Sequence, residues 1–260
     1  MKEHRPVRSD IAWATPYKIV IHGLDLCDEI VGKVDLGQMA FLEMFARLPN
    51  EHEKRMFNAV MVILVEHGIT PSSLATRMTV CGAPEAVQAA IAAGLLSLGS
   101  VFVGSIDNAA RMLQEALADT PEDVDLGELA AKIVADHKSR RQIIPGLGHP
   151  FHKPIDPRTP ALFKVAEETG FSGRYVALMQ KISDEAGRVS KKELPLNVTG
   201  AMAAVASELG LSWRVCRGLA VAARAIGLVG HVIEELKQPM AEEIYLRMEE
   251  EAAGHLRISE

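Results

Sequence analysis

Hydrophobic residues recur along this chain mostly at three- and four-residue spacing, which predicts helices rather than strands. The stretch Leu36 to Leu48 places its apolar side chains on one broad face and stops before Pro49. The stretch Met56 to Val65 is apolar on nearly every side, so we expect a core helix that ends at the sequence Glu66 to Gly68. Tyr17 to Gly23 is almost the only strand candidate, as one short strand or hairpin arm.

Start and stop signals predict further helices in the rest of the chain. Pro84 opens an alanine-rich helix that runs to about Leu98, where Gly99 stops it. Asp107 can cap the next helix, and the sequence Thr120 to Asp123 is a start signal for another. The expected helices from here on cover residues 107–117, 121–137, 159–170, 173–187, 199–209 and 212–236, with a polar, solvated junction at 183–192.

One segment, Ile144 to Arg158, fits neither helix nor strand because it contains two glycines and four prolines. It also contains two histidines, a lysine and an arginine. In a helix-rich chain, an irregular segment dense in ionisable groups is a good place to meet anions and reacting atoms. We expect the glycines to let the backbone approach a ligand and the prolines to hold His149, Lys153 and Arg158 in place. A structured loop with a capping histidine is the alternative interpretation.

The composition of the whole chain limits the class of protein to which this segment can belong. A chain of 260 residues with 48% hydrophobic content can bury a large core, in one large domain or two unequal ones. A net charge of -6 gives no support to nucleic-acid binding. The start of the chain is charged, and the longest apolar run, Val60 to Val65, is far shorter than the roughly twenty residues of a membrane span. We therefore expect a soluble cytoplasmic protein, with Cys27, Cys81 and Cys216 as reduced core thiols.

The candidate chemistry lies in His67, His149, Arg158 and Arg224. Two arginines on separate elements suit a substrate with two or more carboxylates, because guanidinium groups bind carboxylates bidentately. A neutral histidine beside them can exchange a proton with an oxygen near pH 7. The alternatives are isolated core or surface histidines and arginines in ordinary salt bridges. No metal site is expected, because His149 and His152 lie among prolines and no cysteine or carboxylate completes a ligand set.

Five motifs in fixed order resemble the citrate synthase superfamily. The central one is Pro145 to His149, followed by Lys153 and by Asp156 to Arg158. The supporting motifs are residues 66–68 with Ser72 and Arg77 nearby, residues 99–107, residues 194–200 and residues 224–231. Phe102 stands where the synthases carry a histidine, which is similar to the citryl-CoA lyase module of ATP-citrate lyases. The short chain also resembles a stand-alone citryl-CoA lyase.

The resemblance implies an all-α fold, with a large domain of residues 1–105 and 199–260 and an inserted small domain of residues 106–198. It also implies a homodimer or higher homo-oligomer. In it, His67 would contact a dicarboxylate and His149 would bond the oxygen that is hydroxyl in citryl-CoA and carbonyl in oxaloacetate. The implied substrate-binding residues are Arg158, Arg224, Asn197 and Phe102. Those implied for coenzyme A are Ile144, Gly146, Leu147 and Gly148 at the adenine, with Lys153 and Lys192 near the phosphates.

The implied reaction is a lyase reaction on citryl-CoA or a related 3-hydroxyacyl-CoA. His149 takes the hydroxyl proton, the carbon–carbon bond breaks, and oxaloacetate separates from the enol of acetyl-CoA. The coenzyme A thioester is a substrate, and no permanently bound cofactor, nucleic acid or membrane partner is expected. Thr199 stands where the family has the aspartate that moves the proton on the acetyl methyl carbon. Two alternatives therefore stay open: condensation of the citrate or methylcitrate synthase type, and a non-catalytic dimer that binds coenzyme A thioesters.

Overall fold

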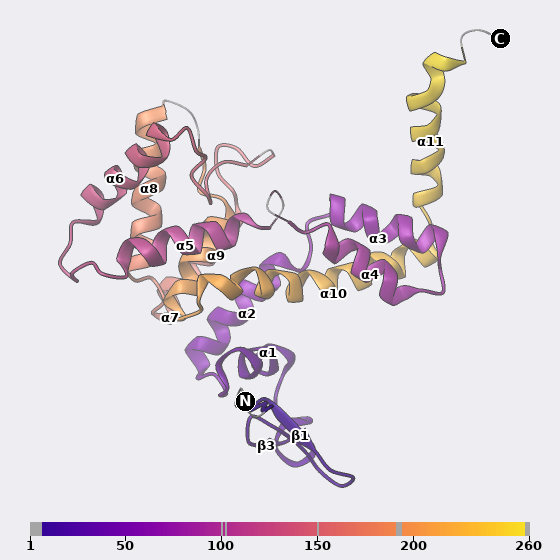
Figure 1. Cartoon of the computed structure of the whole chain (residues 1–260), viewed down its shortest axis with the longest axis horizontal. Coiled ribbons are helices and arrows are strands. Elements are labelled where there is room, and N and C mark those ends of the chain that lie inside the picture. The colour runs from indigo at the N-terminus through magenta and orange to yellow at the C-terminus, as the bar shows by residue number, and fades with distance from the viewer. Residues whose placement is uncertain (1–6, 100, 102, 150, 191–193, 258–260) are drawn as a thin grey trace, which may run out of the picture. The chain divides into compact units, whose positions relative to one another are not determined.

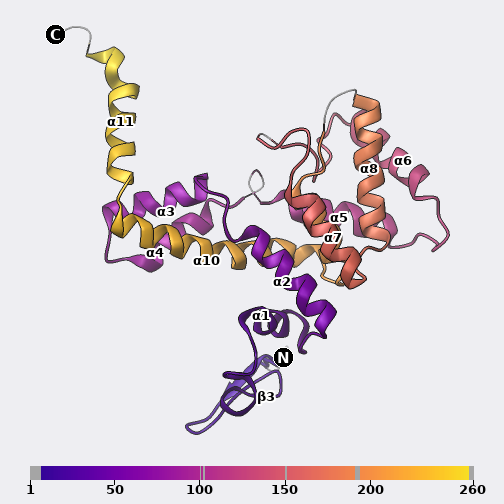
Figure 2. The same ribbon diagram turned by 180° about the vertical axis from the view of Figure 1, so that it is seen from behind.

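The computed structural model describes residues 7–99, 101, 103–149, 151–190 and 194–257. The chain forms two compact units, residues 1–59 and 60–260. Helices make up most of the described chain, as Figures 1 and 2 show from opposite sides. The all-α prediction is confirmed. The expected division into domains of 1–105 with 199–260 and of 106–198 stays a prediction.

The first unit contains a three-stranded antiparallel sheet in the order β1, β2, β3. The strands are β1 (Ala12–Ala14), β2 (Ile19–Ile21) and β3 (Leu24–Asp25), and a π-helical turn, η1 (Leu26–Ile30), follows them. The prediction of one strand was incomplete. All three residues of β1 are exposed, so the strand has no alternation of buried and exposed positions from which it could be predicted. His22 and Gly23 both have positive φ, which turns the chain tightly from β2 into β3.

Helix α1 (Leu36–Phe45) begins where the sequence predicts, because Asp35 and Gln38 form a reciprocal capping box. It ends at Ala46, which adopts the left-handed conformation. The ring of Phe41 stacks on that of Phe45 at 4.1 Å and meets Phe57 edge-on at 5.3 Å. These aromatic contacts join α1 to the start of α2 (Glu51–Val65) and form the core of this unit.

The second unit is built from helices α3 to α11. Their bounds are α3 (Pro71–Gly82), α4 (Val87–Leu96), α5 (Ser105–Leu117), α6 (Leu126–Ser139), α7 (Arg158–Thr169), α8 (Arg174–Ser190), α9 (Val198–Glu208), α10 (Cys216–Lys237) and α11 (Ala241–Ala253). Two short 3-10 turns, η2 (Trp213–Val215) and η3 (Gly254–Leu256), flank α10 and α11. Helix α10 packs along α3 and α4, and α9 packs against α5, α7 and α8.

Helix α9 is the central helix of this unit. Its residues from Gly200 to Ser207 are all buried, and most are alanine, glycine or serine. Small side chains let α5, α7 and α8 approach the α9 backbone from several sides. Asn197 caps the helix by accepting a hydrogen bond from the backbone N–H of Gly200. The first turn of α9, with Thr199, is thereby held in one position.

Among the described residues, the stretch Trp213–Lys237 alone is long and apolar enough, by length and composition, to cross a membrane. Half of its apolar window is buried inside the protein. Its buried face carries Arg224, His231 and Glu235, and Arg77 of α3 bonds to the last two of them. Ionisable groups paired in this way against neighbouring helices are typical of a core helix rather than a membrane span.

Several predicted helix boundaries were wrong. Helix α6 begins after the cap Asp125, because the Asp125 carboxylate accepts from two backbone N–H groups, and not near Pro121. Asp107 lies inside the first turn of α5 and binds Arg217 instead of capping the helix. Helix α8 continues to Ser190, through the expected polar junction, because one side of it is still buried there. Helices α3 and α11 were not predicted.

The prediction of three core thiols holds for one cysteine. Cys216 is buried, and burial raises the pKa of its thiol to about 12. Cys27 and Cys81 are exposed, because they lie in the π-helical turn and at the last turn of α3. All three are free thiols.

Candidate functional site

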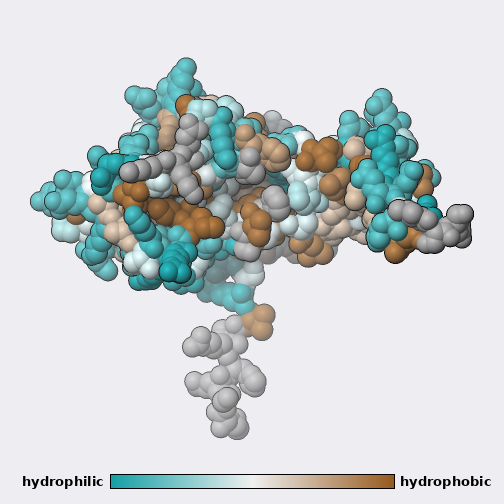
Figure 3. Space-filling view, turned by 90° about the horizontal axis from the view of Figure 1, so that it is seen from above, coloured by the Kyte–Doolittle hydropathy of each residue, from teal (hydrophilic) through white to brown (hydrophobic). Residues whose placement is uncertain are grey.

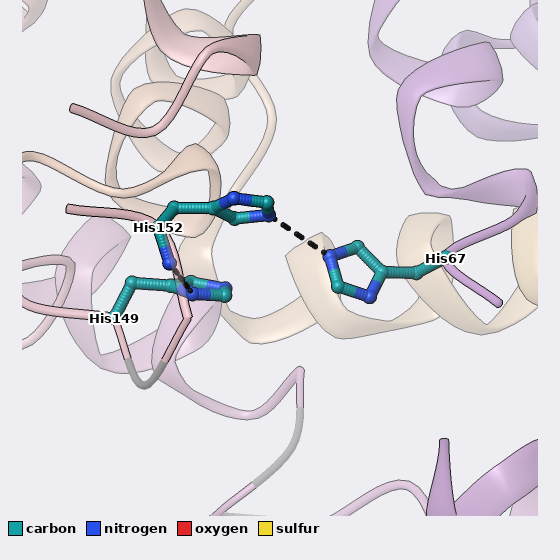
Figure 4. Close-up of side chains that lie close together, drawn as sticks. All are labelled: His67, His149 and His152. Carbon is teal, nitrogen blue, oxygen red and sulfur yellow. Dashed lines mark hydrogen bonds between the residues drawn. The ribbon is translucent and has the colours of Figure 1, made fainter. Parts of the chain in front are cut away.

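Three histidines from two distant parts of the sequence meet in the second unit (Figure 4). His67 follows the end of α2, and His149 and His152 belong to the irregular segment between α6 and α7. The Nε2 atoms of His67 and His152 are 3.3 Å apart, and the rings of His149 and His152 have centroids 4.4 Å apart. One ring nitrogen of each histidine lies within 4.8 Å of the other two. All three side chains are partly buried.

Hydrogen bonds assign the neutral tautomer of His149. Its Nδ1 accepts from the backbone N–H groups of Phe151 and His152, at 3.1 and 3.0 Å. A neutral imidazole has one lone pair in the ring plane. The two backbone N–H groups at Nδ1 outweigh the single and longer approach of Arg158 Nη2 to Nε2 at 3.4 Å, so we place the proton of His149 on Nε2. Burial lowers the pKa of His149, and the nearby His152 and Arg158 lower it further. His149 therefore presents an N–H donor at neutral pH.

His67 is held by its own backbone. The Glu66 carboxylate accepts from the backbone N–H groups of His67 and Gly68, at 2.7 and 2.6 Å. Burial acts to raise the pKa of Glu66, but these two bonds and His231 outweigh it and lower the pKa. Burial lowers the pKa of His67, and the charges of Arg158 and Arg224 add to the effect. His67 is therefore neutral at pH 7.

Behind Glu66, a buried polar chain reaches into α3 and the end of α10. His231 Nε2 lies 3.1 Å from Glu66, while its Nδ1 accepts from Arg77 Nε at 3.0 Å. Arg77 also pairs with Glu235 at 2.9 Å and with Glu234. Because every group in this chain has a partner, it fixes the position of the turn that carries His67.

Arg158 begins α7 and is held by a carboxylate of its own segment. Its guanidinium donates to both oxygens of Asp156, at 3.0 and 2.9 Å, and Asp156 also accepts from the N–H of Val198. Asp156 is fully buried. Burial acts to raise the pKa of Asp156, but the bonds from Arg158 and Val198 hold it below its usual value. The pair fixes Arg158 beside His149, with Nη2 3.4 Å from Nε2.

Arg224 differs from Arg158 because no carboxylate of the described residues forms an ion pair with it. It lies on α10 with 6% of its surface exposed, and its Nε and Nη1 have no hydrogen-bond partner among the described residues. Burial lowers its pKa, while the charge of Glu66 acts in the opposite direction. A buried guanidinium with free donors is costly unless an anion completes it. The arrangement favours a ligand carboxylate.

The histidine cluster has the donor number of a metal site, but its surroundings oppose a cation. His149 would have to give up the assigned tautomer to offer Nε2 as a ligand, which would place an N–H against two backbone N–H groups. The positive charges of Arg158 and Arg224 both act on the cluster. Charge and tautomer together therefore favour an anionic ligand with an oxygen at the histidines.

The segment before His149 is joined to the start of α9. Gly148 N donates to Pro195 O, Asn197 N to Gly146 O, and the Asn197 side chain to Gly148 O, at 2.7, 3.0 and 2.7 Å. Gly146 and Gly200 touch backbone to backbone, so a Cβ on Gly200 would lie 2.7 Å from Gly146 O. Glycine is therefore required at this crossing.

An apolar cavity of about 360 Å³ lies beside this crossing. It is lined by Ile144 and Leu147 together with Val134, Lys138, Gln142, Ile143, Ala186, Val189, Ser190 and Leu194. A larger, open cavity of about 1320 Å³ lies against α5 and α6 and reaches Pro145, but none of the three histidines lines it.

Two hydroxyl groups meet where the first turn of α9 lies against the start of α5. Thr199 Oγ1 donates to Asn197 Oδ1 at 2.7 Å and lies 2.7 Å from Ser105 Oγ. The Asn197 amide has a fixed orientation, because its nitrogen donates to Gly148 O and its oxygen accepts from Gly200 N. Thr199 must then accept from Ser105, so a directed chain runs from Ser105 through Thr199 to Asn197. It contains no basic group.

The structure brings together several of the residues that the sequence singles out: His67, His149, Arg158 and Arg224, with Thr199 and Asn197 at the α9 turn. Lys153 is exposed and makes no described contact that would assign it a role. Phe102 and Lys192 lie outside the described residues. Sequence reasoning missed His152 and Ser105 as site residues. His152 was considered only for metal spacing, although its distance of three residues from His149 was the available signal.

Comparison with known proteins identifies the family. Residues 32–245 match the model of the citrate synthase family described as "Citrate synthase, C-terminal domain". The chain belongs to the citrate synthase family. Its fold is similar to that of citryl-CoA lyase from Hydrogenobacter thermophilus, with a TM-score of 0.81, 34% identity, and coverage of 90% of this chain and 88% of that one.

Other proteins of lower sequence identity are similar to this chain over part of their own length. ATP citrate lyase from Methanothrix soehngenii, solved with citrate and coenzyme A, has the same fold over 91% of this chain and 40% of its own, with a TM-score of 0.74 and 23% identity. The probable ATP-citrate synthase subunit 1 of Neurospora crassa is 25% identical over 84% of this chain. The ATP-citrate synthase beta chain protein 2 of Arabidopsis thaliana is 26% identical over 79%. The chain spans about a third of the length of these two relatives.

Proposed function

We propose that this protein is a carbon–carbon lyase that cleaves citryl-CoA, or a related 3-hydroxyacyl-CoA, into acetyl-CoA and oxaloacetate or another 2-oxo acid. The hydroxyl proton leaves its oxygen, and the bond from the carbinol carbon to the carbon next to the thioester breaks. The electron pair of that bond forms the enolate of the thioester. A proton then adds to the enolate carbon and gives the acetyl methyl group.

The observation that carries this proposal is the meeting of three histidines with two guanidinium groups, one of which is buried and has two donor atoms without a partner among the described residues. The guanidiniums of Arg224 and Arg158 suit the carboxylates of a citryl or oxaloacetyl group. The N–H of His149 suits the oxygen that changes from hydroxyl to carbonyl, since a donor there stabilises the negative charge that develops on it. The similarity to a citryl-CoA lyase over 88% of that chain supports the same class of reaction.

Coenzyme A fits the segment from Ile144 to Gly148. The apolar cavity of about 360 Å³ beside Ile144 and Leu147 is large enough for a purine ring, and Lys138 and Gln142 at its lining can reach polar edges of the base or a phosphate. We propose that adenine binds in this cavity, with Lys153 and Lys192 near the phosphates. The cytoplasm, where acetyl-CoA is used, remains the proposed location.

The proposal is tested by product analysis. Purified protein is incubated with citryl-CoA, and oxaloacetate and acetyl-CoA are quantified by mass spectrometry; a parallel reaction contains acetyl-CoA and oxaloacetate. We expect oxaloacetate and acetyl-CoA to form from citryl-CoA, and no free citrate to accumulate in the parallel reaction, because a lyase breaks the carbon–carbon bond and leaves the thioester intact. Free citrate formed from acetyl-CoA and oxaloacetate would favour the synthase alternative.

A second candidate function, binding of coenzyme A thioesters without turnover, is favoured by one observation. The hydroxyl chain from Ser105 to Asn197 contains no acid or base able to protonate or deprotonate carbon near pH 7. Isothermal titration with citryl-CoA distinguishes the two functions. Tight binding with no product after long incubation would support the binding protein and contradict the lyase.

A further inference from the structure

The three histidines can surround a single oxygen atom. One nitrogen of each ring lies within 4.8 Å of the other two, so there is a point that lies no more than about 2.8 Å from all three. That separation is a hydrogen-bond distance. A hydroxyl oxygen at this point could donate one hydrogen bond and accept two. His67, His149 and His152 therefore form a socket for one oxygen that can both give and receive protons (Figure 4).

His149 cannot receive the proton in its assigned tautomer. Its one lone pair in the ring plane is on Nδ1 and faces the backbone N–H groups of Phe151 and His152. Its Nε2 carries hydrogen and can donate to the substrate oxygen. The resemblance noted in the sequence makes His149 the acceptor of the hydroxyl proton. Because this tautomer has no free lone pair for that proton, another group must accept it.

The pair of His67 and His152 contains that acceptor. Their Nε2 atoms lie 3.3 Å apart, and two ring nitrogens in such contact must share one hydrogen, with one N–H and one lone pair. His67 lies beside the charges of Arg158 and Arg224, which oppose a further positive charge on its ring. The lone pair that can accept a proton is therefore better placed on His152.

We infer that His152 is a catalytic base, which takes the substrate hydroxyl proton while His149 donates a hydrogen bond to the same oxygen. This inference rests on the proposed lyase function. The proton moves from the hydroxyl oxygen to His152 Nε2, and the electron pair of the oxygen–hydrogen bond becomes the carbonyl. The pair of the breaking carbon–carbon bond moves to the enolate. His152 becomes neutral again when one proton is returned to the enolate carbon.

The test replaces His152 by glutamine, which keeps a hydrogen-bonding side chain but cannot accept a proton near pH 7. We expect kcat for citryl-CoA cleavage to fall by about 10² to 10⁴ fold, with the Kd for oxaloacetate changed by less than about threefold. Ile155→Ala is the matched control, because Ile155 lies in the same segment with 63% of its surface exposed. Circular dichroism of His152→Gln, and of a second variant, His152→Asn, checks that the protein remains folded. A His152→Gln enzyme with more than a tenth of the wild-type kcat would overturn the inference.

A binding measurement separates this inference from the proposed function. Citrate carries the same tertiary hydroxyl and carboxylates as the citryl group and can be used even if no thioester is cleaved. We expect citrate to shift the ¹⁵N resonance of His152 Nε2, identified by its loss in His152→Gln. If wild-type protein cleaves no 3-hydroxyacyl-CoA while this resonance shifts, the lyase proposal fails and the oxygen socket stands. If citrate binds and the resonance does not move, the role of His152 is refuted whatever the enzyme does.

Discussion

At the scale of single residues, the two arginines of the site differ in how their charges are balanced. Arg158 is paired with the fully buried Asp156, whereas Arg224 is buried and two of its donor atoms have no partner in the part of the chain that the structure describes. A paired guanidinium contributes to the fold, and an unpaired one reduces the stability of the unliganded protein. We therefore propose that Arg224, rather than Arg158, is the arginine whose charge serves ligand binding and not the stability of the fold.

This difference predicts opposite effects of two substitutions on stability. Arg224→Leu should raise the Tm of the unliganded protein and weaken dicarboxylate binding by about 2 to 5 kcal/mol, because a buried carboxylate then loses its partner. Arg158→Leu should lower the Tm, because it leaves Asp156 buried and unpaired. Calorimetry with and without oxaloacetate measures both effects. Coenzyme A affinity should change little in Arg224→Leu, and an equal loss of both ligands would indicate a disrupted fold instead.

The histidines predict how stability depends on pH. The pKa values of His67 and His149 are lowered in the folded protein from about 6.5, so the unfolded chain binds more protons just below that pH. Stability should be complete above about pH 6.5 and should fall as the pH decreases toward the folded pKa values. Urea unfolding between pH 5 and 8 measures this trend. His149→Gln should make it shallower, and an unchanged slope would contradict the assignment.

Thr199 predicts a gain of function on substitution. Thr199→Asp would place a carboxylate at the α9 turn, where Ser105 can still donate to it. We expect deuterium exchange into the methyl group of acetyl-CoA, with oxaloacetate present, to rise by about 10² fold. Some loss of stability should accompany it, because the new carboxylate faces the fixed oxygen of Asn197. Thr199→Asn is the control without basicity. Rapid exchange in the wild type would show that another base already acts.

At the scale of elements, the crossing of the Gly146 segment with α9 fixes the position of the segment Ile144 to Gly148. In Gly200→Ala, the added Cβ would meet Gly146 O at 2.7 Å and Gly146 Cα at 2.9 Å, so one backbone must move. We expect stability to fall by about 1 to 3 kcal/mol and coenzyme A binding to weaken. Gly187→Ala in α8 is the matched control, because its Cβ meets nothing within 4 Å and should be neutral or stabilising. Equal effects of the two substitutions would contradict this account.

Periodicity predicted most helices of this chain but not all of their ends. Apolar spacing located α1 and α2, start and stop signals located α4 to α10, and glycine and proline content located the irregular segment with the histidines. Helix α11 is mostly exposed and gives little amphipathic signal, and α3 buries serine, threonine and arginine where a core pattern needs apolar residues. The boundaries of α6 and α8 depend on a cap and on tertiary burial, which spacing does not record.

The candidate site could be listed from the sequence but not assembled from it. Motif order selected His67 and His149, yet the two positions are 82 residues apart in the sequence and only the fold brings them together. The role of His152 depends on two hydrogen bonds that set the tautomer of its neighbour. Such directional information is a property of the folded backbone, so neither composition nor spacing contains it.

At the scale of the whole molecule, exposed apolar residues remain on the second unit. Ile226, Val229, Ile233 and Leu236 form one stripe along α10 at spacings of three and four residues, each with 40 to 54% of its surface exposed. Figure 3 shows hydrophobic residues at several places on one face of the molecule. Leu96, at the end of α4, is 85% exposed. A continuous apolar stripe on a core helix is removed from water only when a partner surface covers it.

We expect this partner to be a second copy of the chain, as the sequence also predicts. A stable dimer needs about 800 Å² from each subunit, and a stripe of four branched or long aliphatic residues on α10 can supply its centre. Light scattering should give twice the chain mass of 28.2 kDa at micromolar concentration. The double substitution Ile233→Glu and Leu236→Glu should give a monomer, because each subunit would have to bury two unpaired charges in the interface. Tyr17→Glu, at a fully exposed position of the first unit, is the control and should stay dimeric. A stable monomer in the wild type would refute the dimer and leave the stripe to another partner.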